Sequence, residues 1–372
     1  MARILMDGFE LGEPAIRTGV FGLWQRSLWQ FDVSNTTISA DSNVVSNMAC
    51  HGNYSFLIRN HTGPQRIFRN LGQNITEIYG RVNFRLDPAQ SHDGVPPSIL
   101  QFLDDSFDEV ADIRVERNEA FVEVCLYVGG VEVARLAEAF LTNTWARLEW
   151  HILIDDNVGV FEFKCNGNSL LNYTGDTDSL GTGHIRYFCI GKGPASRLTA
   201  HYDDVALNDT VDDGSGNHSW VGRGGIYLVK PKGEGHYSQW LPSNPTYDNW
   251  EMVNTIPHDG DGTYVQGQTH GHRDSYEMET LEDILGAPLE EGTVIKAVQH
   301  CFMGRYEDAH AAVETFIRIG ETDYDLNNIV DMQNGYFRYW DRILSINPIA
   351  TQAWTAEAFD ALELGIKFDD SE

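Results

Sequence analysis

Polar and apolar residues alternate along much of the first half of the chain. In residues 79–86 the apolar and polar side chains fall on opposite faces of an extended segment, with Val82 and Phe84 on the apolar face. A period of two predicts a half-buried β-strand. The same alternation recurs in residues 111–116, 121–128 and 131–136. Gly129-Gly130, before the last of these, predicts a two-residue hairpin turn, because both positions then need positive φ.

Further short segments of the same kind continue to the C-terminus. They are residues 145–154, 158–165 and 184–191, then 225–229, 263–266, 274–278, 294–303, 312–319 and 364–368. Residues 355–362 predict a short helix. Many short strands separated by turns are typical of β-sandwiches. The sequence therefore predicts an all-β protein of two tandem β-sandwich domains, residues 1–210 and 225–372. The small and acidic residues 211–224 are the predicted linker.

Charge limits the partners of the chain. Its 55 Asp and Glu against 26 Lys and Arg give a formal net charge of −29. Such a surface repels phosphate backbones and anionic lipid, which argues against nucleic acid or membrane as partners. No run approaches the roughly 18 apolar residues of a membrane span, and residues 1–10 do not resemble a secretion leader. We therefore expect synthesis in a cytoplasm.

The five cysteines predict neither a disulfide framework nor a zinc motif. Their number is odd, their spacing is wide and no Cys-x-x-Cys occurs. We expect buried, reduced thiols, since free cysteine is commonly a core residue. The five positions are Cys50, Cys125, Cys165, Cys189 and Cys301.

Two stretches resemble a known family. Residues 4–10 (ILMDGFE) and 202–209 (YDDVALND) are similar to the first and last strands of a concanavalin A-like, laminin-G-like jelly roll, where the two strands lie side by side. This ending, followed by a Gly/Ser/Asn-rich segment, resembles virion and minor tail proteins of tailed bacteriophages. The second half resembles the domain that follows in such proteins. Its matching segments are residues 238–243, 259–265, 347–355 and 362–367.

The resemblance implies a structural virion protein of a tailed phage, tail-associated or adhesin-like. Its partners would be other virion proteins and a host surface glycan, and it would form a homo-oligomer, a trimer or a ring. Two alternatives stay open. One is a capsid decoration or cement protein, and the other is a free carbohydrate-binding module.

The sequence predicts no enzyme. Glucanases with a concanavalin A-like fold place paired carboxylates on one face of a strand. Glu109 and Asp112 are three residues apart, a spacing that puts the two carboxylates on opposite faces of a regular strand. The adjacent Asp155-Asp156 pair also lacks the glucanase pattern. Motifs for a serine nucleophile, a phosphate loop or a dinucleotide site are missing as well.

Two groups of residues are weak candidates for metal ions. Sandwich lectins often hold structural calcium near their paired terminal strands, and the oxygens could come from Asp7, Glu10, Asp203 and Asp204. A turn or edge role for these side chains is the alternative. The spacing of His270 and His272 suits Zn²⁺ or Ni²⁺, or a site on the axis of a trimer, against exposed loop histidines as the alternative.

Several aromatic residues lie among polar loop residues. Sugar-binding sandwiches stack pyranose rings on such side chains, so they are weak candidates for glycan contacts. Packing in a core or an interface is the alternative. The candidates are Trp24, Trp29, Trp240, Trp250 and Tyr247.

Overall fold

The structure is a computed structural model that describes most of the chain. The described residues are 3–11, 30–31, 43–46, 48–59, 65–87, 96–192, 199–306, 311–332, 334–335 and 337–369. Within them the chain forms two compact units that meet in sequence at Ile226 and Tyr227. No helix in these ranges is long and apolar enough to cross a bilayer.

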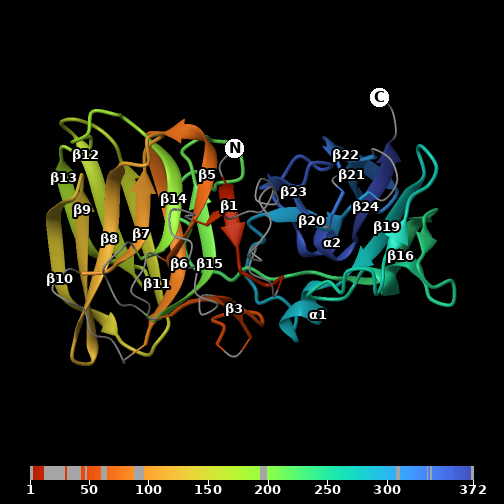
Figure 1. The fold of residues 1–372 in the computed structure, drawn as a ribbon, viewed down its shortest axis with the longest axis horizontal. Coiled ribbons are helices and arrows are strands. Elements are labelled where there is room, and N and C mark those ends of the chain that lie inside the picture. Colours follow the sequence, from red (N-terminus) through yellow and green to blue (C-terminus); the bar gives the residue numbers. More distant parts are fainter. Residues whose placement is uncertain are drawn as a thin grey trace. The chain divides into compact units, whose positions relative to one another are not determined.

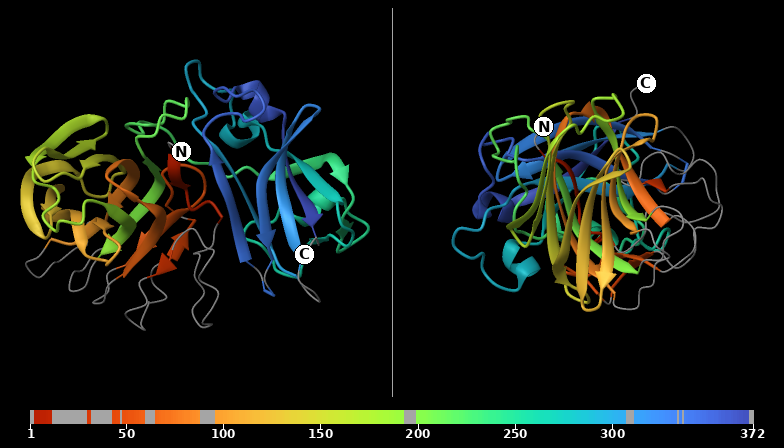
Figure 2. Two further views of the ribbon diagram at one scale, coloured as in Figure 1. Left: turned by 90° about the horizontal axis from the view of Figure 1, so that it is seen from above. Right: turned by 90° about the vertical axis from the view of Figure 1, so that its left-hand side faces the viewer.

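The first unit is a sandwich of two antiparallel sheets (Figures 1 and 2). The eight-stranded sheet has the order β13 (Asn168–Gly175), β12 (Gly159–Cys165), β11 (Ala146–Leu153), β6 (Glu77–Leu86), β15 (Ala200–Asn208), β4 (Ser55–Ile58) and β3 (Asn43–Val45), with β1 (Arg3–Asp7) paired to β15. The seven-stranded sheet has the order β10 (Val131–Leu141), β9 (Phe121–Val128), β8 (Glu109–Asn118), β7 (Ser98–Leu103), β14 (Ile185–Lys192), β5 (Gln65–Ile75) and β2 (Gln30–Phe31). The pairing of β1 with β15 is the one that the jelly-roll resemblance implies.

The core of this unit lies between the two sheets. Trp150 of β11 is fully buried, and its ring centroid lies 5.7 Å from those of Phe102 (β7) and Phe188 (β14) in the other sheet. Gly80 of β6 lies beneath the indole, where a Cβ atom would come within 2.1 Å of Trp150. Burial of large aromatic side chains is a main source of stability in such a core.

The segmental predictions hold well in this unit. Residues 121–128 form β9 with the predicted bounds, and the hairpin glycines Gly129 and Gly130 both have positive φ, 51° and 79°. The all-β prediction is confirmed, and the first unit is the predicted sandwich of two antiparallel sheets.

Residues 211–224 differ from the prediction of a linker, because they belong to the first unit. Asn217 and Val221 are buried, and the side-chain amide nitrogen Nδ2 of Asn208 donates to the carbonyl oxygen of Ser219 at 2.7 Å. The ammonium nitrogen of Lys164 (β12) lies over the Trp220 ring, 3.3 Å from the centroid of that ring. These few apolar and amide groups attach an otherwise polar segment to the outer face of the eight-stranded sheet.

The second unit has a five-stranded antiparallel sheet, β16 (Pro231–Ser238), β19 (Arg273–Met278), β24 (Leu362–Asp369), β21 (Ala312–Ile319) and β22 (Thr322–Asp331). Two ribbons accompany it, β17 (Leu241–Pro242) with β18 (Val265–Gln266), and β20 (Val298–Gly304) with β23 (Phe337–Leu344). The helices are η2 (Asn249–Met252), α1 (Leu281–Leu285) and α2 (Ala356–Asp360).

The ribbon β20–β23 and the five-stranded sheet of the second unit share a core. Ile317 and Leu326 from the sheet pack with Leu344 of β23 and with Trp354. The predicted helix at residues 355–362 is α2, where the Thr355 hydroxyl accepts a hydrogen bond from the amide of Ala358 at 3.1 Å, a standard N-terminal cap. The predicted strand at residues 225–229 is wrong, since these residues have no sheet partner.

Candidate functional site

The outer face of the seven-stranded sheet carries a polar group at its centre. Along β7 and β8, Phe102 and Ile113 point to the core, so their neighbours Gln101 and Asp112 point away from it. Gln101 and Asp112 are directly paired across the two strands, and both are buried despite lying on the outer face. Buried polar groups need partners, which directs attention to their surroundings.

A β-bulge in β8 brings Glu109 to the same face as Asp112. Ala111 pairs with Phe102, but the next pairing joins Glu109 to Leu103, so Val110 is an extra residue. Such a bulge shifts the alternation by one position. The prediction that the three-residue spacing separates the two carboxylates is therefore wrong.

Arg114 of β8 joins these two carboxylates. Its Nη2 lies 2.9 Å from Glu109 Oε1, and its Nε lies 2.7 Å from Asp112 Oδ2. The guanidinium also lies 3.9 Å from the ring centroid of Tyr127 on the neighbouring strand β9. The planar guanidinium thus bridges the two carboxylates in a partly buried setting.

Asp112 has an unusual proton affinity. Burial, and next the negative charge of Glu109, raise the pKa of its carboxyl group to about 7, against the opposing effects of Arg114 and of the Ser98 hydroxyl, which donates to Asp112 Oδ1 at 2.5 Å. A carboxyl group that titrates near neutral pH beside a second carboxylate is a common arrangement at functional sites.

An aromatic cluster lies beside this polar group. The rings of Phe107 and Tyr187 (β14) are stacked, with centroids 4.2 Å apart and planes at 16°. Phe68 of β5 meets both rings edge-on, at 5.7 and 5.8 Å. Phe107 is 47% exposed, so this cluster presents an apolar surface to solvent. We call Phe68, Phe107 and Tyr187 the aromatic platform.

Hydrogen bonds link the polar residues near the platform. Arg66 Nη1 donates to Gln101 Oε1 at 2.8 Å, and Gln101 Nε2 donates to Glu109 Oε2 at 3.4 Å. Tyr187 (β14) is paired with Leu103 (β7), and Leu103 is paired with Glu109 (β8). One strand, β7, therefore lies between Tyr187 of the platform and the Glu109 carboxylate. The outer face thus combines an exposed aromatic surface with a row of oriented donors and acceptors. Sequence reasoning missed Phe68, Phe107 and Tyr187, because nothing in their local context marks them.

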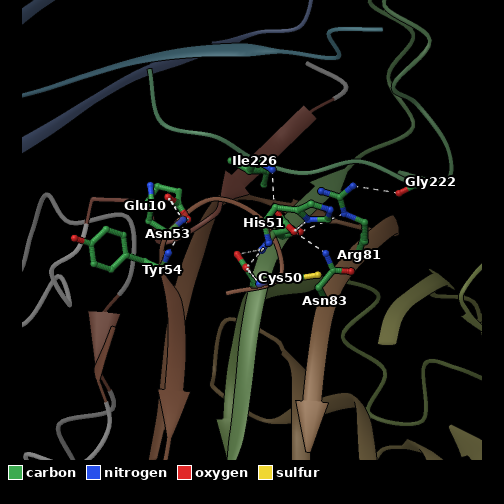
Figure 3. A network of polar contacts seen from close by, with 11 residues as sticks. Glu10, Cys50, His51, Asn53, Tyr54, Arg81, Asn83, Gly222 and Ile226 are labelled. Atoms are coloured by element: carbon green, nitrogen blue, oxygen red, sulfur yellow. Dashed lines mark hydrogen bonds and ion pairs between the residues drawn. The ribbon is translucent and has the colours of Figure 1, made fainter. Parts of the chain in front are cut away.

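The predicted acidic residues Asp203 and Asp204 lie at a second register shift, in β15. Figure 3 shows the polar network around them, with Cys50, His51, Asn83 and Ile226 labelled. Asp204 has a left-handed backbone, with φ 52°. Its Oδ2 accepts from Asn83 Nδ2 and contacts His51 Nδ1, both at 2.6 Å, while its Oδ1 accepts from the amide of Ile226 at 2.6 Å. Both aspartates have no exposed surface.

Asp203 is held mainly by backbone amides. Its Oδ2 accepts from the amides of Cys50 and His51, at 2.7 and 3.3 Å, and its Oδ1 accepts from the amide of Asp204 at 2.7 Å. Burial, then the charge of Asp204, raise the pKa of Asp203 to about 8. Burial also raises the pKa of the Cys50 thiol to about 12.

The proposed calcium ligands meet N–H donors in this structure. Glu10 accepts from the amides of Asn53 (3.0 and 2.8 Å) and Tyr54 (3.0 Å), and Asp7 Oδ1 accepts from the amide of Phe9 at 2.7 Å. Calcium binds six to eight oxygen atoms. The calcium site stays a prediction. Nearby, a thiol, an imidazole and a carboxylate from Cys50, His51 and Asp204 approach one another.

The metal site at the histidine candidates stays a prediction. His270 Nδ1 lies 3.5 Å from Asp369 Oδ1, and the His272 carbonyl oxygen accepts from Trp240 Nε1 at 3.2 Å. The group of three potential ligands found in the described residues includes neither histidine. Asp259, the first residue of the segment 259–265, caps a tight turn, since its Oδ1 accepts from the amide of Thr263 at 3.0 Å.

The aromatic candidates divide into three groups. Trp24 and Trp29 lie outside the described residues. Trp240 packs against a core cluster of the second unit, Val313, Val330, Met332 and Tyr339. Trp250 is half-buried in η2, whereas Tyr247 is 50% exposed. Cys125, Cys165 and Cys189 are buried as expected, whereas Cys50 and Cys301 are half-buried.

No protein-family model and no curated protein matches the chain. Among solved structures, the chain is similar to the cellulose-induced protein Cip1, with TM-score 0.42 and 15% identity over 59% of this chain and 100% of that one. It is also similar to an endo-1,3-β-glucanase from Streptomyces sioyaensis, with TM-score 0.37 and 10% identity over 56% and 95%. A glycoside hydrolase family 131 catalytic domain from Coprinopsis cinerea gives TM-score 0.34 and 13% identity over 50% and 84%.

The prediction that the chain is not an enzyme does not stand. Glycoside hydrolases are among the structures that it resembles, and the bulge in β8 removes the geometric reason for that prediction. At these identities the likenesses concern the fold alone and assign no activity to this chain. They give no support to a phage origin, which stays a prediction.

Proposed function

We propose that the first unit binds carbohydrate on the outer face of its seven-stranded sheet. The observation that carries the proposal is the aromatic platform, in which the 47% exposed ring of Phe107 is stacked on Tyr187 at 4.2 Å. Aromatic faces attract the C–H-rich faces of sugar rings. Stacking on Tyr187 and the edge-on contact with Phe68 hold the exposed ring in one orientation.

The polar groups beside the platform suit sugar hydroxyls. The Arg66 guanidinium, the Gln101 amide and the Glu109 carboxylate offer donors and acceptors in fixed directions, because each is held by a hydrogen bond to its neighbour. A net charge of −29 disfavours sulfated or uronic acid-rich polymers. We therefore expect a neutral glycan as the ligand.

The setting that we propose is the virion of a tailed phage, where the chain is a tail-associated, adhesin-like protein in a homo-oligomer. Support for this setting comes from the sequence resemblance of residues 4–10, 202–209 and the second half to phage virion proteins. In this arrangement one unit contacts other virion proteins and the first unit faces the host surface.

Glycan binding is tested with a glycan array and then by calorimetry on the full chain. Replacement of the platform, Phe107→Ala or Tyr187→Ala, is expected to weaken binding of the best neutral glycan about tenfold or more, equivalent to about 1.4 kcal/mol. The matched control is Tyr264→Ala, which removes a 39% exposed aromatic ring from the second unit. Binding that is absent from the wild type, or equal in all four proteins, contradicts the proposal.

The virion setting has its own test. Antibodies against the second unit, viewed on intact particles by electron microscopy, are expected to mark the tail or its tip. Label over the head would replace the tail assignment with capsid decoration. Particles that carry no label would contradict a virion role, while leaving the glycan measurement unaffected.

A further inference from the structure

Three potential metal ligands meet beside the middle of β15 in the first unit, and Figure 3 labels two of them, Cys50 and His51. Cys50 and His51 are consecutive residues in the bend before β4, and Asp204 lies in β15. The Cys50 thiol sulfur, an imidazole nitrogen of His51 and a carboxylate oxygen of Asp204 all lie within 4.8 Å of one another. In sequence the first two residues are more than 150 positions from the third, so no local motif marks the group.

We propose that Cys50, His51 and Asp204 bind a divalent transition metal ion of the zinc class, with a fourth position open to water. The donor chemistry selects the metal. Thiolate and imidazole ligands favour Zn²⁺ and similar ions, whereas Ca²⁺ and Mg²⁺ favour oxygen ligands. The set of one sulfur, one nitrogen and one oxygen therefore departs from the oxygen-only calcium site that the sequence suggests.

The ligand atoms need only a small adjustment. Ligands of a tetrahedral zinc ion lie about 3.3–3.6 Å apart, given bond lengths of about 2.0–2.3 Å. The His51 Nδ1–Asp204 Oδ2 distance is 2.6 Å, so these two atoms would separate by about 1 Å when an ion enters between them. The His51 side chain is 37% exposed and is followed by Gly52 at φ 63°, which leaves it room to move.

The surrounding hydrogen bonds hold the ligands in place. Asp204 keeps two partners that an ion would not displace, Asn83 Nδ2 on Oδ2 and the amide of Ile226 on Oδ1, both at 2.6 Å. On the other side of the group, Asp203 Oδ2 accepts from the amides of Cys50 and His51. One buried carboxylate thus positions the backbone of two ligands, the role that outer residues play at metal sites.

The charge balance of the group also favours a cation. Glu10, Asp203 and Asp204 are buried together, at 6%, 0% and 0% exposure. The buried guanidinium of Arg81 lies nearby, but its Nε and Nη1 donate to the carbonyl oxygens of Asp204 and Gly222, both at 3.2 Å. The Arg81 guanidinium offsets part of this negative charge. Buried charges are normally paired or coordinate metals, and a divalent ion bound to Asp204 would add to that compensation.

The test uses the full chain, stripped with a chelator and refilled separately with Zn²⁺, Co²⁺ and Ca²⁺. We expect one zinc per chain by elemental analysis, and a thiolate-to-cobalt absorption band with Co²⁺. Cys50→Ser and His51→Gln are expected to lower zinc affinity at least about 100-fold, since even outer-residue changes cost 10- to 100-fold. Cys50→Ser should also abolish the cobalt band. The matched control is Cys301→Ser, which alters the other half-buried thiol.

Three results would overturn the proposal. The first is a refilled wild type that retains no transition metal, and the second is retention of calcium alone. The third is zinc binding and a cobalt band that persist in Cys50→Ser, which would place the ion elsewhere. Circular dichroism of each variant shows whether it is folded. If a ligand variant does not fold, the cobalt bands of the wild type and of Cys301→Ser still test the proposal.

Discussion

Two acidic pairs in the first unit, Glu109 with Asp112 and Asp203 with Asp204, arise in the same way and end in different surroundings. Each lies at a register shift, in β8 and in β15. The first pair shares one guanidinium, that of Arg114. In the second pair, the hydrogen bonds seen among the described residues come from backbone amides, Asn83 and His51.

This difference shows how the partner of a buried carboxylate sets its role. The Arg114 guanidinium partly offsets the charge of Asp112, whose pKa burial and Glu109 raise to about 7. Around Asp203 and Asp204, backbone amides and the Asn83 side chain hold the carboxylates in place and tie together distant segments. The following predictions, in order of decreasing effect, test this contrast.

Loss of the Asp204 carboxylate is expected to have the largest effect on stability. Asp204→Ala, measured in chelator, should lower the free energy of unfolding by about 4 kcal/mol, because the buried Asn83 amide and Ile226 amide lose their acceptor. Asp204→Asn should cost roughly half as much, since asparagine tolerates φ 52° and retains one acceptor. Urea unfolding gives both values. Equal losses would mean that the acceptor retained by asparagine contributes nothing to stability.

Removal of the arginine partner should cost somewhat less. Arg114→Ala leaves Asp112 buried without its ion pair, and we expect a loss of about 3 kcal/mol at pH 8. At pH 5 the loss should be smaller, because the Asp112 carboxyl group, with a pKa of about 7, is then protonated and needs no cation. A loss that is the same at both pH values would contradict this account of the pair.

The pH dependence of stability distinguishes the pairs more finely. Folding raises the pKa of Asp112 from 3.8 to about 7 and that of Asp203 from 3.8 to about 8. Because the folded protein holds these protons more tightly, the stabilisation is complete below pH 4 and is lost as pH rises through the folded pKa. In the wild type, the free energy of unfolding should fall between pH 4 and 7 because of Asp112, and between pH 4 and 8 because of Asp203. Asp112→Asn should remove the first of these declines, and Asp203→Asn should remove the second. Each slope is at most about 1.4 kcal/mol per pH unit.

The smallest effect is expected for Glu109→Gln. The Glu109 side chain is 22% exposed, so its ion pair with Arg114 should contribute about 0.5 kcal/mol. Its charge is nevertheless one cause of the raised pKa of Asp112. An NMR titration of the variant should show a lower pKa for Asp112 than in the wild type. An unchanged pKa would mean that the charge of Glu109 does not influence Asp112.

Local pattern was enough to predict much of the fold. Alternation placed β9 at residues 121–128, and the glycine pair predicted the hairpin at Gly129 and Gly130. These features depend on neighbouring residues only, since side-chain period and turn geometry are properties of the local backbone. The predicted strand at residues 225–229 failed for a non-local reason. The amide of Ile226 donates to Asp204 and has no strand as partner.

The candidate sites depended on information that alternation does not contain. A strict period of two separates Glu109 from Asp112, and only the pairing of β8 with β7 reveals Val110 as the extra residue. Likewise, the Cys50-His51 dipeptide is unremarkable until β15 brings Asp204 to it.

The sequence by itself therefore determined the class of fold, the main strands, the acidic surface and the absence of a cysteine framework. The tertiary structure alone decided which carboxylates share a face, which aromatic rings stack into a platform and which ligands meet. The physical reason is that register and burial are set by strand partners far away in the chain, and these determine charge balance and hydrogen bonding.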